Sequence, residues 1–188
     1  MKHLISFLIL LISLFNYSRA QTDRTDLLLQ KLKSKTITVA ERKELQNIAY
    51  DIQNRGQLLD EVRHDYSASL ALITKAITIF NSLGDTLNIA NNRKFKGYLL
   101  GRFGKFTEGK AQIHEAINLY QLKNAGWGIA VSQFDLSRVF EFENKLDSAL
   151  FYCKSALRYW KAKEDSERIS GKSKMNIKNL KKQDLQKK

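Results

Sequence analysis

A chain of 188 residues with 43% hydrophobic side chains is long enough for one domain with a buried core. The chain has no proline, which favours helices joined by short turns, and one cysteine, which excludes an intramolecular disulfide. The formal charge of +13 is uneven, because residues 171–188 hold seven lysines and one acid, whereas residues 21–170 keep a net charge of only +5. A strong polyanion-binding surface is therefore not expected in the central region.

The first twenty residues have the pattern of a secretory signal peptide. A basic start is followed by an apolar run at residues 4–15 and by small residues at Ser18 and Ala20. Twelve helical residues reach only about 18 Å, which is short of a hydrocarbon core about 30 Å thick, so a membrane span is the weaker interpretation. We expect cleavage between Ala20 and Gln21 and export to the periplasm or out of the cell.

Residues 21–37 are predicted to form a short N-terminal helix and linker, with the helical stretch at residues 26–33 packing on the first repeat unit. The segment Thr38-Val39-Ala40-Glu41 is a capping box, which predicts that a longer helix begins there.

The centre of the chain repeats itself with a period of 40 residues. Ala76, Ala116 and Ala156 open the similar strings AITIF, AINLY and ALRYW. Large and small residues recur at the same spacing before each alanine, as in Tyr66/Phe106/Leu146, Ser69/Gly109/Ala149 and Ile73/Ile113/Cys153. Such a period indicates a repeat architecture in which each unit is one supersecondary element.

Each unit is predicted to be a pair of antiparallel helices. Turn-forming residues at His64–Asp65, Gly104 and Asn144 separate the two helices within each unit. Gly84–Asp85 separates the first unit from the second. The predicted hairpins span residues 38–83, 85–123 and 125–163, within a repeat region at residues 38–164.

This pattern resembles the tetratricopeptide repeat, in which small, apolar and aromatic residues follow one another in a set order. The matching residues are Gly97, Leu100, Phe106, Gly109, Ile113 and Ala116 in the second unit and Ser137, Phe140, Leu146, Ala149, Cys153 and Ala156 in the third. The first unit matches less well, with Gln57, Asp60, Tyr66, Ser69, Ile73 and Ala76. The period exceeds the family's usual length of about 34 residues, and the closing proline is missing, as in long-helix members with a turn such as Leu83-Gly84-Asp85.

The resemblance implies an all-α fold, an α-solenoid of antiparallel helix pairs wound into a right-handed superhelix. About three repeats and a terminal capping helix are expected. The basic segment at residues 165–188 continues the period, because Ile169 follows Ile129 and Leu180 follows Phe140 by 40 residues, so this segment is the expected cap. Its lysines are interpreted as a solvated face, with weak contact to an anionic membrane surface as the alternative. Nucleic acid is not an expected partner, because residues 161–188 lack aromatic side chains for stacking.

The resemblance also implies a partner-binding groove lined by the first helix of each unit. Carrying over the family's groove-facing positions predicts the following groove residues: Asn54, Asn91, Lys94, Tyr98, Arg102, Phe134, Arg138 and Glu141. Lys94, Arg102 and Arg138 together could hold a carboxylate. Phe142 is also a groove-facing position, and for Phe134 and Phe142 packing between units is an equal alternative.

No catalytic, cofactor-binding or metal-binding constellation is recognisable. The three histidines are not at ligand spacing, no phosphate-binding loop follows a strand, and Cys153 is interpreted as a buried core thiol. The sequence therefore predicts a non-enzymatic, exported scaffold that binds a protein or peptide. The alternative is a sensory or regulatory fragment related to the N-terminal regions of envelope histidine kinases or transcription regulators. Three units are near the minimum for a stable array, so self-association is a further hypothesis.

Overall fold

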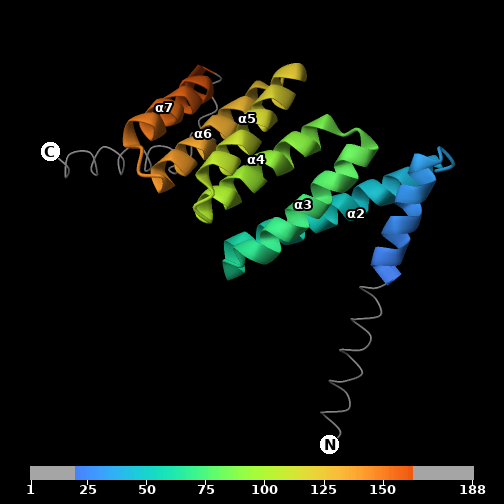
Figure 1. Cartoon of the computed structure of the whole chain (residues 1–188). Coiled ribbons are helices and arrows are strands. Elements are labelled where there is room, and N and C mark those ends of the chain that lie inside the picture. Colours follow the sequence, from blue (N-terminus) through green and yellow to red (C-terminus); the bar gives the residue numbers. More distant parts are fainter. Residues whose placement is uncertain (1–19, 163–188) are drawn as a thin grey trace, which may run out of the picture.

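The computed structural model describes residues 20–162, apart from the side chains of residues 62 and 63 (Figure 1). The predicted signal peptide, except for Ala20, and the predicted cap at residues 165–188 lie outside this region. All regular secondary structure in the described region is helical, which confirms the all-α fold class. An N-terminal helix covers residues 20–33, and the remaining elements are α2 (Val39–Leu58), the π-helix η1 (Leu59–Arg63), α3 (Tyr66–Leu83), α4 (Thr86–Arg102), α5 (Phe106–Leu122), α6 (Gly126–Phe142) and α7 (Leu146–Ala162).

The helices pack as antiparallel pairs that follow one another along the molecule, as Figure 1 shows for α2/α3, α4/α5 and α6/α7. The first helices also touch one another. The Asn92 side chain of α4 donates to Gln53 of α2 at 2.6 Å, and α4 packs directly on α6. In turn, α3 lies against both α2 and α4, and α5 against both α4 and α6. This arrangement is an α-solenoid of antiparallel helix pairs, as predicted.

Local sequence signals set the helix ends. Both hydrogen bonds of the predicted capping box are present, since Thr38 Oγ1 accepts from the Glu41 amide and the Glu41 carboxylate accepts from the Thr38 amide. Gly84 ends α3 with a φ of 71°, and the Asp85 carboxylate caps α4 by accepting from the Asn88 amide. Left-handed backbone at His64, Gly104 and Asn144 makes the turn within each hairpin, where the sequence predicted the breaks.

The repeated small residues mark the places where helices approach most closely. Ala76, Ala116 and Ala156 are completely buried. A Cβ atom built on Gly97 of α4 would lie 2.5 Å from the carbonyl oxygen of Gly109 on α5, so these two backbones are nearly in contact. The thiol of Cys153 is also completely buried, as expected for a core position.

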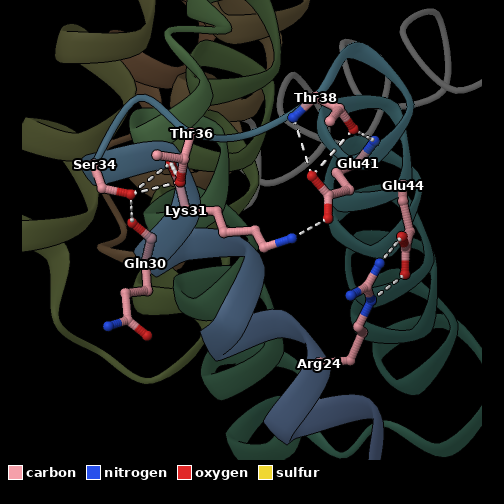
Figure 2. A network of polar contacts seen from close by, with 8 residues as sticks. All are labelled: Arg24, Gln30, Lys31, Ser34, Thr36, Thr38, Glu41 and Glu44. Atoms are coloured by element: carbon pink, nitrogen blue, oxygen red, sulfur yellow. Dashed lines mark hydrogen bonds and ion pairs between the residues drawn. The ribbon is translucent and has the colours of Figure 1, made fainter.

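The N-terminal helix is longer than the stretch that the sequence indicated, and it packs on α2 through the buried side chains of Thr25 and Leu28. Figure 2 shows the polar contacts across this junction. Arg24 binds Glu44 through two hydrogen bonds of 2.8 and 2.6 Å, and Lys31 pairs with Glu41. Glu41 therefore connects the capping box of α2 to the preceding helix.

This role of Glu41 predicts a specific acid sensitivity. The hydrogen bond from Lys31, together with that from the Thr38 amide, lowers the pKa of Glu41 to about 2. Because this value lies below the pKa of the unfolded chain, the stabilisation is complete above about pH 4.5 and is lost as the pH falls towards 2. Glu41→Gln should flatten the stability curve in this window, as measured by urea unfolding at pH 2–6. Glu108→Gln, an exposed carboxyl on α5, is the control, and parallel curves for Glu41→Gln and wild type would contradict the expectation.

Within residues 20–162, no helix has the length and apolar character needed to cross a membrane.

Candidate functional site

Four of the eight predicted groove residues lie close together where α4 faces α6. They are Lys94, Tyr98, Arg102 and Arg138. Three of them, Tyr98, Arg102 and Arg138, form with Tyr66 a set that we call the arginine–tyrosine cluster. Its bonds join the start of α3, the second half of α4 and α6.

The phenol of Tyr98 is the centre of this cluster. Its oxygen accepts a hydrogen bond of 2.9 Å from Arg102 Nη1 and another of 2.7 Å from Arg138 Nη2. Arg102 Nη2 also donates to the hydroxyl oxygen of Tyr66. The guanidinium carbon of Arg138 lies 4.0 Å from the centre of the Tyr98 ring, and that of Arg102 lies 4.4 Å from the centre of the Tyr66 ring. Cation–π contacts therefore add to the hydrogen bonds in holding both arginines.

The repeat itself positions these side chains. Tyr98 and Arg102 are one turn apart on α4, and therefore share a helix face. Arg138 stands 40 residues after Tyr98, so it occupies the same position in the next unit, where α6 packs on α4. Only 4% of Tyr98 is exposed, and its ring is therefore a buried support for the arginines rather than an open contact surface.

Lys94 does not form an open carboxylate-binding site together with the two arginines. Its ammonium group lies 3.5 Å from the Asp135 carboxylate of α6, in a pair whose side chains are only 14% and 12% exposed. Arg138 Nη1 is 3.9 Å from the same carboxylate, which is a looser contact. Asp135 is thus already the partner of Lys94, and the sequence pattern did not single it out.

The remaining predicted residues lie elsewhere. Phe134 packs on Trp160 of α7 within its own hairpin, with ring centres 5.8 Å apart. Phe142 packs between units, 6.0 Å from the ring centre of Tyr98, and stays 38% exposed. Asn54 is exposed on α2, and Asn91 and Glu141 are half-buried on α4 and α6, outside the set that defines the cluster.

Asp60 in η1 is a residue of the site that sequence reasoning missed. It is only 9% exposed, and its Oδ1 atom is buried with no hydrogen-bond partner in the described region. Burial raises the pKa of Asp60, while the nearby charges of Arg102 and Arg138 act in the opposite direction. The signal for this residue was present in the repeat, because Asp60 stands where the next two units have Leu100 and Phe140. A carboxylate at an apolar repeat position is expected to be buried.

The cluster offers hydrogen-bond donors and positive charge to a ligand. Between residues 20 and 162, no group of three His, Cys, Asp or Glu side chains is placed to hold a metal ion. The cluster instead presents guanidinium donors beside exposed rings, of which Phe103 is 46% exposed and packs on Tyr66. In comparisons with known proteins, no family model matches this chain, and no curated protein matches its sequence.

Proposed function

We propose that this chain is an exported, tetratricopeptide-like scaffold that binds a protein or peptide on the face where α4 meets α6. The observation that carries this proposal is the arginine–tyrosine cluster, in which both arginines reach the surface while tyrosine hydroxyl oxygens accept hydrogen bonds from their guanidinium groups. The 40-residue register and the stacked hairpins support the family resemblance. The apolar run in the first twenty residues supports export.

The composition of this face agrees with that of protein interfaces. Arginine, tyrosine and phenylalanine are enriched at the centres of interfaces, and tyrosine and arginine often supply much of the binding energy. Here Arg102 is exposed, Arg138 has a side chain that is 34% exposed, and Phe103 and Phe142 add exposed apolar area beside them. Because the side chains are already held in place, less conformational entropy is lost when a partner binds.

Capture of a partner from the envelope fraction tests this proposal. The double variant Tyr98→Phe/Arg102→Gln removes the shared hydroxyl and one guanidinium while preserving ring size. After cross-linking, this double variant should no longer capture the partner that the wild-type chain captures. Its helicity, measured by circular dichroism, should be unchanged. Mass spectrometry of the exported chain should find a mature N-terminus at Gln21.

Arg93→Gln is the matched control, because Arg93 is on the same helix but pairs with Glu115 of α5 instead of the cluster. This variant should keep the partner. Retention of the partner by the double variant would exclude the face between α4 and α6 as the binding surface.

A further inference from the structure

We infer that the arginine–tyrosine cluster is a receptor for an acidic side chain within an internal, partly apolar segment of the partner. This inference rests on the proposed function and names the chemistry that the face would select.

The first argument is the charge of the two arginines. Their bonds to the same Tyr98 oxygen, 2.9 and 2.7 Å long, hold the two donor nitrogens within about 5.6 Å of each other. Two like charges so close repel, and a shared anion relieves that repulsion. Within residues 20–162, no carboxylate forms an ion pair with Arg102, and Asp135 approaches Arg138 only loosely because it belongs chiefly to Lys94. Arg102 therefore has no ion-pair partner among the described residues, and Arg138 has only the loose contact with Asp135.

The second argument is the supply of open donors. A guanidinium has five N–H groups. Arg102 uses two of its nitrogens, on Tyr98 and Tyr66, and Arg138 forms one hydrogen bond, with Tyr98. Among residues 20–162 the other N–H groups form no hydrogen bond, apart from the loose contact of Arg138 Nη1 with Asp135, and both side chains reach solvent. Carboxylate oxygens usually lie about 2.8 Å from such charge-assisted donors, so the open N–H groups of both arginines could bind one carboxylate.

The third argument concerns the neighbours of the anion. Tyr66 and Phe103 form one pair of rings beside Arg102, with ring centres 6.3 Å apart. Phe142 lies on the third repeat unit, after Phe103 on the second, and its ring centre is 5.7 Å from the guanidinium carbon of Arg102. Because exposed rings come from two successive units, apolar residues on both sides of the acidic residue would be accommodated. This favours an internal segment over a chain terminus.

Asp60 is expected to weaken the affinity of the cluster for an anion. Its carboxyl is buried near Arg102 and Arg138 without bonding to either of them in the described region. With Lys94, the three cations and the two carboxylates of Asp60 and Asp135 leave the site with one net positive charge. An ionised Asp60 repels an incoming anion, so its neutral replacement should tighten binding.

The experiment uses the full chain and pools of nonapeptides that are acetylated and amidated. One pool has glutamate at the centre and the other has glutamine, with random uncharged residues elsewhere. We expect the chain to retain glutamate peptides, and the glutamine counterpart of each to bind at least about tenfold more weakly. Arg138→Gln should cause a loss of similar size, measured by fluorescence polarisation, whereas Asp60→Asn should strengthen binding about fivefold.

Equal binding of paired glutamate and glutamine peptides would overturn the inference, and so would failure of both pools. Retention of only a third pool, with central glutamine and a free carboxyl terminus, would also overturn it in favour of a terminal carboxylate. These outcomes are separate from the proposed function, which is judged by partner capture from the envelope. A captured partner that depends on Tyr98 and Arg102, without a preference for glutamate peptides, would leave the scaffold proposal standing and the acidic specificity rejected.

Discussion

Gly97→Ala is expected to destabilise the chain by about 2–3 kcal/mol, although alanine is the better helix former by about 1 kcal/mol. The new methyl group would lie 2.5 Å from the carbonyl oxygen of Gly109 and equally close to the Ile113 side chain. A backbone carbonyl cannot rotate away as a flexible side chain can, so α4 and α5 would have to separate. The corresponding loss in melting temperature is about 5–10 °C.

Circular dichroism melts and urea unfolding would measure this change. The matched control is Ala111→Gly on the exposed face of α5, which loses about 1 kcal/mol of helix propensity without any packing contact. If Gly97→Ala were as stable as wild type, the near contact between the backbones of α4 and α5 would be wrong. In the third unit the equivalent residues are Ser137 and Ala149, so this constraint is specific to the second hairpin.

Asp60→Leu is expected to stabilise the chain by about 1–3 kcal/mol at pH 7, the usual cost of a buried polar group without a partner. The position is apolar in the following units, where Leu100 is only 4% exposed. The effect should depend on pH. Because burial raises the pKa of Asp60 in the folded chain, the part of the destabilisation that is due to ionisation is absent below the unfolded pKa. It becomes fully destabilising once the pH exceeds the raised value.

Urea unfolding of wild type and variant from pH 3 to pH 8 would test this, with Asp60→Asn as a variant of matched size. The advantage of Asp60→Leu should shrink as the pH falls. Lower stability of both variants at pH 7 would show that attraction to Arg102 and Arg138 outweighs burial. A gain in stability at Asp60 would also be consistent with a binding role, because natural proteins tend to break packing rules at functional sites.

Residue patterns alone predicted part of the candidate site. The 40-residue register placed Tyr98 and Arg138 in equivalent positions, and the structure joins them by a hydrogen bond. The same register predicted groove residues that the structure places apart from the cluster, such as Phe134, whose ring packs on Trp160. Periodicity defines the face of a helix that carries a side chain, but a half-buried face borders two neighbouring helices.

The sequence by itself determined the helices α2 to α7, most of their ends and their pairing, but neither the length of the N-terminal helix nor the π-helix η1. Capping at Thr38 and Asp85 and left-handed turns at Gly104 and Asn144 depend on residues within a few positions of each other, so they can be recognised locally. Only the tertiary structure decided which charges meet. The pairing of Lys94 with Asp135, the burial of Asp60 and the sharing of Tyr98 by two arginines all depend on how successive hairpins pack. Ion pairs and hydrogen bonds act over a few ångströms, whereas a repeat pattern defines position only to within a helix face.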